Sequence, residues 1–284
     1  MGITHECDYP ASIGDQPRIT ASRISHETMT SAEIDHAVRS QLDGHGSIYD
    51  LDEKKLRELQ PDLILTQELC EVCAVSYQTV ERAARSFAAD VKVVSLEPNT
   101  IEDIFANIQL VGELTNRSKA AGELVNELRL RLEKVRARTG TIGYRPRTLM
   151  LEWLEPPFAP GHWVPEQVEL AGGDHAFGKA GQKSVTTTAA EIGAYDPEVI
   201  VLIPCGFYKE DIVRQLPAAN LPEGWNDLTA VKAKQVWATD ATSYFSRPGP
   251  RVVDGVEILA KILHPEVFGF PTDDEAIRLS EVRA

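Results

Sequence analysis

The sequence has no long hydrophobic run, few cysteines and no excess of positive charge. No apolar segment approaches the ~20 residues that a membrane-spanning helix needs, which argues against an integral membrane protein. The 43 acidic residues outnumber the 29 basic ones, and the resulting formal charge of −14 would repel the phosphates of a nucleic acid. Composition otherwise fits a globular protein, with 43% hydrophobic and 25% charged residues.

The first ten residues, MGITHECDYP, lack the basic and apolar stretches that open a secretory signal. Four cysteines are also too few for a disulfide scaffold in 284 residues. These two absences predict a cytoplasmic protein with reduced thiols. The prediction becomes a periplasmic or extracytoplasmic location if the N-terminus is truncated.

Motifs of common enzymes are missing as well. The chain has no Ser-His-Asp order, no glycine-rich phosphate loop and no H-E-x-x-H. Glu166 and Glu169 share one face of an expected helix, and we expect both to be solvated. The sequence therefore predicts a protein without catalytic activity and without a required cofactor.

Two segments, 60–85 and 196–216, share one pattern. In each, a turn containing Asp and Pro precedes a short apolar strand, followed by a cysteine-bearing loop and a helix. The strands are expected at 63–65 and 199–203. Short continuous apolar strands suit parallel sheets covered by helices on both faces. The pattern predicts an α/β protein with two Rossmann-like lobes.

Between these segments, residues 116–138 contain no proline and a single glycine, and leucine recurs there every four residues. This spacing predicts one helix about 30 Å long. We expect it to be a backbone helix that joins the two lobes. The predicted domains are an N-terminal lobe at 1–113, a connecting helix at 114–140 and a C-terminal lobe at 141–284.

The second lobe is expected to continue with further strands and helices. Strands are predicted at 147–153 and 235–238, helices at 164–170 and 251–263, and a loop at 239–250. The tail after Pro271 is acidic and polar, so we expect it to be loosely held.

Aromatic residues gather where these strands end. Loops at the carboxyl ends of parallel strands line the binding crevice of open α/β sheets. The residues in question are Phe158, His162 and Trp163 after the first strand, Cys205, Phe207 and Tyr208 after the second, and Tyr244, Phe245 and Arg247 after the third, with Tyr49 on the same side of the first lobe. Rings with an arginine among them predict a site for a large, flat, partly apolar ligand that bears amide or carboxylate groups.

Other interpretations of these residues stay open. Each aromatic ring taken alone favours core or loop packing over ligand contact, and only the clustering of the rings at strand ends favours a ligand site. Arg247 is as consistent with a salt bridge inside its loop as with ligand contact. His5 and His162 are candidates for axial ligands of a cobalt or iron centre, although a loop histidine more often only forms hydrogen bonds.

The cysteines offer a different kind of site. Cys70 and Cys73 form a C-x-x-C at an expected helix N-terminus, where the helix dipole lowers a thiol pKa. With Cys7 and Cys205, both at strand ends, they would supply four thiolates for a metal or a redox centre. The latter two cysteines are isolated in the sequence, however, so we favour packing of small buried thiols over a zinc or iron-sulfur site.

Four stretches resemble a known family. They are THECDYP at 4–10, PDLILTQELCEVCAVS at 61–76, GHWVPEQVELAGG at 161–173 and YFSRPGPRVVDGVEILAKILHPE at 244–266. Together with the expected connecting helix, they resemble the cobalamin-binding, iron-complex-type substrate-binding proteins of ABC transporters, whose lobes are joined by a single helix. Members of this family usually carry one more strand before the first stretch, so the resemblance implies an N-terminal lobe without its first strand.

The resemblance implies non-enzymatic binding of a corrinoid of the cobalamin type in the cleft between the lobes, for uptake, delivery or intracellular holding. It implies that the ligand is faced by Tyr49, Gln67, Glu68, His162, Trp163 and Arg247. It also places Glu71 and Glu210 near the positions where such proteins dock on a transporter permease. Haem or a ferric siderophore in the same cleft is one alternative, and a thiol or metal redox protein that uses Cys70 and Cys73 is another.

Overall fold

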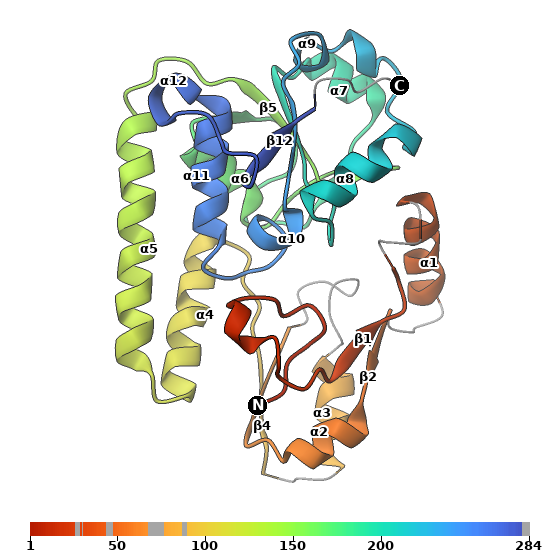
Figure 1. Cartoon of the computed structure of the whole chain (residues 1–284), viewed down its shortest axis with the longest axis vertical. Helices are drawn as coiled ribbons and strands as arrows, with labels where there is room; N and C mark the ends of the chain where they lie inside the picture. Colours follow the sequence, from red (N-terminus) through yellow and green to blue (C-terminus); the bar gives the residue numbers. More distant parts are fainter. Residues whose placement is uncertain (26–28, 30, 44–47, 68–76, 87–89, 280–284) are drawn as a thin grey trace. The chain divides into compact units, whose positions relative to one another are not determined.

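A computed structural model describes residues 1–25, 29, 31–43, 48–67, 77–86 and 90–279 (Figure 1). The chain divides into two compact units, Met1–Glu97 and Pro98–Ala284. Within the described residues, no helix combines the length and the apolar character that crossing a bilayer requires.

The described residues of the first unit form two small strand pairs. Strands β1 (Thr20–Ser22) and β2 (Tyr49–Leu51) run antiparallel, whereas β3 (Leu63–Thr66) and β4 (Lys92–Ser95) run parallel. The parallel pair confirms the strand expected at 63–65.

Two of the helices described in the first unit, α2 (Glu53–Leu59) and α3 (Tyr77–Arg85), contribute to a small core. The other described helical elements are the 3-10 turn Ala11–Ile13 and helix α1 (Ser31–Asp43). Leu56 of α2, Ile64 of β3 and Val80 of α3 are buried in one cluster. The expected β-loop-α unit therefore packs through its own apolar residues.

A five-stranded sheet forms the centre of the second unit, in the order β12-β11-β10-β5-β8. The bounds are β5 Arg147–Leu151, β8 Asp174–His175, β10 Val199–Leu202, β11 Val236–Thr239 and β12 Ala276–Arg278. All neighbours are parallel except β12, which runs antiparallel to β11. Every residue of β10 is buried, as the continuous apolar run predicted.

A second, three-stranded sheet lies in the same unit, in the order β6-β7-β9. It consists of β6 (Trp153–Leu154), β7 (Pro157–Ala159) and β9 (Val185–Thr186). The expected strand at 147–153 is thus split after Leu151, and its last residue starts a hairpin.

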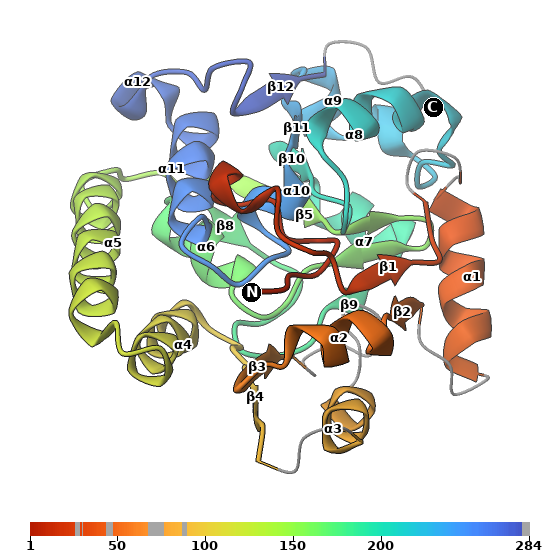
Figure 2. The same cartoon turned by 60° about the horizontal axis from the view of Figure 1, so that its bottom comes forward.

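Helices cover both faces of the large sheet. Figures 1 and 2 show α6 and α11 on one side and α7 and α8 on the other. The bounds are α6 Val164–Leu170, α7 Ala189–Tyr195, α8 Lys209–Gln215, α9 Thr229–Lys232, α10 Ala241–Tyr244, α11 Val252–Leu263 and α12 Pro265–Phe268, with 3-10 turns at Leu216–Ala218 and Trp225–Asp227. The helix expected at 164–170 has these bounds in the structure, and α10 occupies part of the expected loop.

Two long helices, α4 (Ile101–Leu114) and α5 (Ser118–Thr139), form a hairpin at the side of the second unit (Figure 1). They approach closely at Gly112, where an added Cβ would lie 2.4 Å from the Cβ of Ala121. Helix α5 also packs on α11. The sequence placed this helix in a separate connector at 114–140, but its packing makes it part of the second unit.

Two expectations about polar segments are wrong. The described part of the tail, residues 272–279, is not loose, because β12 pairs with β11 and the Glu275 carboxylate forms an ion pair with Lys261. Glu166 is not a simple solvated carboxylate either. It is partly buried and accepts a hydrogen bond from the backbone N–H of Ile101, 2.7 Å away, at the start of α4. Burial raises the pKa of this carboxyl.

Candidate functional site

Three loops leave the carboxyl ends of β5, β10 and β11, and backbone hydrogen bonds join them. The N–H of Cys205, after β10, donates to the carbonyl of Glu152, after β5, over 3.2 Å. The N–H of Thr242, after β11, donates to the carbonyl of Phe207 over 3.3 Å. The structure therefore brings together the three loops that the sequence predicted at one edge of the sheet.

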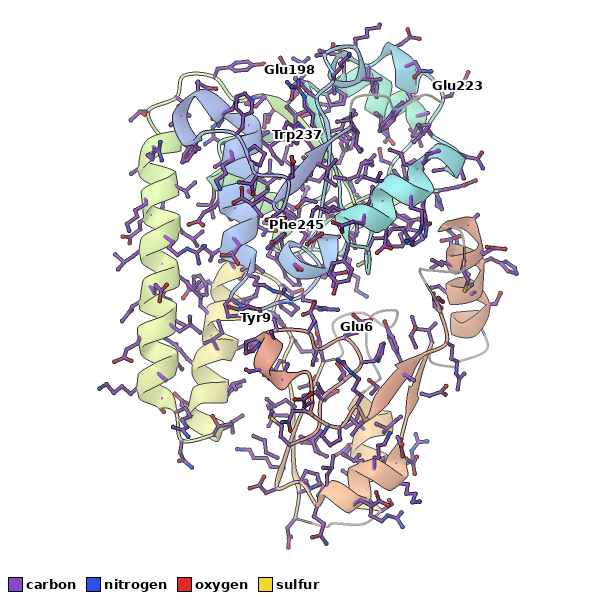
Figure 3. All side chains as sticks on the ribbon, viewed as in Figure 1. Glu6, Tyr9, Glu198, Glu223, Trp237 and Phe245 are labelled. Atoms are coloured by element: carbon purple, nitrogen blue, oxygen red, sulfur yellow. The ribbon has the colours of Figure 1, made fainter. Side chains whose placement is uncertain are left out.

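Three aromatic residues at these loops are buried, namely Trp163, Phe207 and Phe245, and together they are called the floor. Trp163 has a relative exposure of 4% and Phe245 of 2%. The indole Nε1 of Trp163 donates to the carbonyl oxygen of Phe245 over 2.8 Å. Phe245 lies at the end of α10, in the interior of the second unit (Figure 3). Since the indole N–H is already used, Trp163 links α6 to the loop after β11.

Phe207 completes the floor. It is 1% exposed, and its ring meets the ring of Trp153 edge to face, with centroids 5.7 Å apart. Such a pair adds packing energy beyond the buried area. The buried state of Trp163, Phe207 and Phe245 fits the core-packing interpretation, and their contact with a ligand stays a prediction.

The other predicted residues of these loops keep some surface in solvent. Tyr208 is 37% exposed, and Phe158, His162, Tyr244 and Arg247 are intermediate between buried and exposed. Burial raises the pKa of the Tyr244 hydroxyl, and the nearby Asp240 carboxyl adds to this effect. Of the predicted ligand-binding residues in the second unit, these are the ones with appreciable surface open to solvent.

The turn before α6 is tightly packed. An added Cβ on Gly161 would lie 2.1 Å from the carbonyl oxygen of Gln182, so only glycine fits there. His162 has φ of 52°, and its backbone N–H donates to the same carbonyl over 2.6 Å. Its Nδ1 lies 3.4 Å from Oδ1 of Asn99. Burial, with a smaller effect from Lys183, lowers the pKa of this imidazole, which favours its neutral form.

A polar cluster that the sequence did not predict lies at the end of β5. The hydroxyl of Ser184 donates to Glu152 Oε2 over 2.5 Å and also accepts from the N–H of Gly161. The thiol of Cys205 lies 3.8 Å from Glu152 Oε1 and 3.5 Å from the hydroxyl of Ser246. Burial raises the pKa of the Glu152 carboxyl. The signal that could have revealed this cluster is a glutamate at the end of an apolar strand.

Glu210 lies at the start of α8, and its side chain is 67% exposed. The ammonium of Lys209 contacts both this carboxylate, at 3.2 Å, and that of Asp240, at 3.9 Å. The exposed position is accessible to another protein. Docking on a permease stays a prediction.

In the first unit, the predicted residue Tyr49 lies beside His5, with ring centroids 5.1 Å apart. The imidazole Nδ1 of His5 is 2.7 Å from the hydroxyl of Thr20. Gln67 is partly exposed at the end of the described segment. The predicted residues Glu68, Cys70, Glu71 and Cys73 lie outside the described residues.

Two of the four cysteines, Cys7 and Cys205, lie in the described part of the chain. The thiol of Cys7 lies 3.3 Å from the hydroxyl of Thr4, and Cys205 belongs to the cluster around Glu152. The described part of the chain contains no group of three or more His, Cys, Asp or Glu side chains able to hold a metal ion. The C-x-x-C of the alternative interpretation is not in that part.

Residues 8–242 match the model of the periplasmic binding protein family. The chain belongs to this family. A curated relative, an uncharacterized ABC transporter substrate-binding lipoprotein of Bacillus subtilis, is 24% identical over 223 residues. The match covers 76% of this chain and 66% of the relative, just under two thirds of its length.

Solved structures share the fold of this periplasmic binding protein. A periplasmic haem-binding protein of Pseudomonas aeruginosa has a TM-score of 0.69 at 16% identity, covering 94% of this chain and 85% of that one. The periplasmic vitamin B12 binding protein of Vibrio cholerae has a TM-score of 0.63 at 18% identity, covering 92% and 86%. A possible iron-binding protein of Staphylococcus epidermidis has a TM-score of 0.66 at 20% identity, covering 92% and 89%.

These similarities confirm the predicted family, the two-lobed α/β fold and the general function of solute binding. They leave the identity of the solute open, because the named ligands differ between the solved proteins. The cytoplasmic location expected from the N-terminal segment finds no support, since the similar proteins are named as periplasmic or as a lipoprotein.

Proposed function

We propose that this periplasmic binding protein binds a corrinoid of the cobalamin type, without catalysing a reaction, and presents it to an ABC-transporter permease outside the cytoplasm. The observation that carries the proposal is the junction of the loops after β5, β10 and β11 over the floor of Trp163, Phe207 and Phe245. The stretches at 161–173 and 244–266, on which the resemblance to cobalamin-binding proteins rests, supply two parts of this junction.

The chemistry of the accessible side chains suits such a ligand. A corrinoid has a broad, mainly apolar ring system with amide groups at its rim. Tyr208 and Tyr244 offer ring faces that can pack on the apolar ring system and hydroxyls that can form hydrogen bonds with the amide groups. The guanidinium of Arg247 carries several N–H donors, which match amide carbonyls at the rim. The protein needs no cofactor for this task.

Haem or a ferric siderophore is the second candidate. The observation that favours it is the partly exposed imidazole of His162, whose lowered pKa keeps a ring nitrogen free of a proton for an iron centre. The fold accommodates haem in the Pseudomonas aeruginosa protein. The two candidates therefore differ in the chelate, not in the edge of the sheet that receives it.

Calorimetric titration of the purified protein with cyanocobalamin, aquocobalamin, haemin and a ferric hydroxamate tests the proposal. We expect saturable binding of a cobalamin at micromolar or lower concentration, and competition by the second cobalamin. Binding of haemin or the ferric hydroxamate alone would replace the proposal by the second candidate. Absence of heat with all four compounds, confirmed by equilibrium dialysis, would overturn both.

A permease contact through Glu210 is part of the proposal. The carboxylate is exposed and forms an ion pair only with Lys209 of its own helix among the ion pairs of the described residues. Glu71, the other glutamate expected at a docking position, lies outside those residues.

A further inference from the structure

Two polar side chains on the buried face of α6 hold the segment between α10 and α11. Trp163 and Gln167 are one helical turn apart and therefore point the same way. Trp163 Nε1 donates to the carbonyl of Phe245 over 2.8 Å. Gln167 Nε2 donates to the carbonyl of Tyr244 over 3.0 Å and to that of Val252 over 2.8 Å. The segment 244–252 is thus tied to α6 at both ends.

The amide of Gln167 has one orientation that works. Its side chain is fully buried, and its two N–H groups satisfy two carbonyl oxygens. A flipped amide would place Oε1, which cannot donate, against those two carbonyl oxygens and so remove both hydrogen bonds. In the present orientation Oε1 is buried, with no hydrogen-bond partner among the described residues. A glutamine is therefore used here for its two donors, at the expense of one buried acceptor.

Helix α11 makes room for this contact at Gly255. An added Cβ on Gly255 would lie 2.7 Å from Gln167 Nε2 and 2.8 Å from the carbonyl oxygen of Tyr244. Glycine inside a helix is unfavourable by about 1 kcal/mol relative to alanine. The missing side chain at this position is explained by the space that the glutamine amide and the Tyr244 carbonyl occupy.

The segment held in this way carries Tyr244 and Arg247, two of the accessible side chains at the carboxyl edge of the sheet. We infer that Gln167 is a positioning residue for ligand binding: its amide fixes the backbone of 244–252, so that these two side chains are ordered before the ligand arrives. This inference rests on the proposed function for the ligand, whereas the ordering of the segment is a property of the free protein. Ordering in advance strengthens binding because less conformational entropy is lost in the complex.

The test compares Gln167→Met with Val168→Ala. Methionine has nearly the size of glutamine but no donor. Val168 is the next residue of α6, is fully buried and has no polar side-chain group, so its truncation lowers stability without touching the three hydrogen bonds. Hydrogen exchange of residues 244–252 in the free protein is measured first. Affinity for the chelate that the wild-type protein binds is measured second, at temperatures equally far below each variant's Tm.

We expect Gln167→Met to speed exchange in 244–252 and to weaken ligand binding about tenfold, which corresponds to about 1.4 kcal/mol. Val168→Ala is expected to leave both nearly unchanged. Equal exchange and equal affinity in the two variants would overturn the inference. If Gln167→Met does not fold, Gly255→Ala, which pushes on the same amide, is measured in the same way with the same criteria. A wild-type protein that binds no chelate would defeat the proposed function, and the exchange data would still decide whether the glutamine orders the segment.

Discussion

Tyr208 is the most exposed aromatic residue among those predicted at the site in the second unit. It follows β10 at the carboxyl edge of the sheet, whereas Tyr144, 56% exposed, precedes β5 at the opposite edge. The two tyrosines therefore form a matched pair in which only one lies where the ligand is proposed to bind.

We expect Tyr208→Ala to weaken chelate binding about fivefold, since an exposed aromatic contact contributes about 1 kcal/mol. Tyr144→Ala is expected to leave the affinity unchanged. Titration calorimetry of both variants with the ligand of the wild-type protein measures the difference. A loss of affinity in Tyr144→Ala, or none in Tyr208→Ala, would contradict the placement of the site.

His175 ends β8 with both ring nitrogens buried and without a hydrogen-bond partner among the described residues. Burial lowers the pKa of this imidazole to about 4, although the nearby backbone of Thr148 and, to a smaller extent, the carboxylate of Asp174 oppose the change. The unfolded chain takes up this proton near pH 6.5, but the folded chain does so only near pH 4. The stabilising effect of a neutral His175 is therefore complete above pH 6.5 and is lost as the pH falls towards 4.

Replacing this histidine by leucine removes the titrating group. We expect the wild-type protein to lose about 2–3 kcal/mol of unfolding free energy relative to His175→Leu between pH 7 and pH 4. Urea denaturation of both proteins at several pH values measures this difference. The exposed His36 of α1, changed to leucine, is the control. Parallel curves for wild type and His175→Leu would show that the ring is not buried in its neutral form.

Arg131 joins two helices of the second unit. Its guanidinium, on α5, forms two hydrogen bonds with Glu257 of α11, at 3.0 and 2.6 Å, and a further ion pair with Asp254. These contacts raise the pKa of the guanidinium, with the hydrogen bonds to Glu257 as the main cause. Bidentate contacts between an arginine and a carboxylate are stronger than single ion pairs.

We expect Arg131→Met to lower the unfolding free energy by about 1 kcal/mol, because all three side chains keep some contact with solvent. The effect should shrink in 1 M salt, which screens the remaining charges. Lys119→Met is the control, since Lys119 of α5 is 90% exposed and pairs only loosely with Glu123. Equal destabilisation by both changes would mean that the Arg131 network adds nothing specific.

Elements with strong local signals could be predicted from the sequence. Proline at the second position of α6 and two glycines after it define a helix that the structure places at the predicted residues. The β-branched run of β10 predicted a buried strand. The end of the strand expected at 147–153 was harder to predict, because the split after Leu151 depends on pairing between Trp153 and Phe158, five positions apart along the chain.

Dependence on contacts between residues that are apart along the chain also explains which features of the site the sequence did not predict. It predicted which loops meet, because parallel strands end at one edge. It did not predict that Trp163 uses its indole N–H inside the protein, or that Glu152 meets Ser184 and Cys205, because those contacts join residues far apart in sequence. Burial of an aromatic side chain depends on such contacts and not on its position after a strand.

At the scale of the molecule, the boundary between the two units lies at Glu97 and Pro98. The sequence placed the end of the N-terminal lobe at residue 113, because the leucine pattern of residues 116–138 predicted a separate connecting helix. The structure assigns α4 to the second unit, since Ile104 and Phe105 are buried in it and Gly112 fits against Ala121 of α5.

This boundary predicts how fragments behave. We expect residues 98–284 to unfold cooperatively on their own, because they contain a complete sheet with helices on both faces. A fragment of residues 114–284 lacks α4 and exposes Val125 and Leu128 of α5, so we expect a lower Tm or aggregation. Calorimetry of the two fragments measures this. A more stable 114–284 fragment would favour the boundary expected from the sequence.

The last strand of the sheet has a consequence for solubility. Strand β12 lies antiparallel along β11, whose four residues are all buried, and the guanidinium of Arg278 covers the ring of Trp237 at 5.6 Å. Without this cover, a row of free amides and carbonyls beside an apolar strand would be open to a strand from another molecule. The acidic residues that precede β12 add repulsion between copies. Because β12, the new edge of the sheet, is only three residues long, we expect the C-terminal segment to reduce sheet-to-sheet aggregation at high concentration.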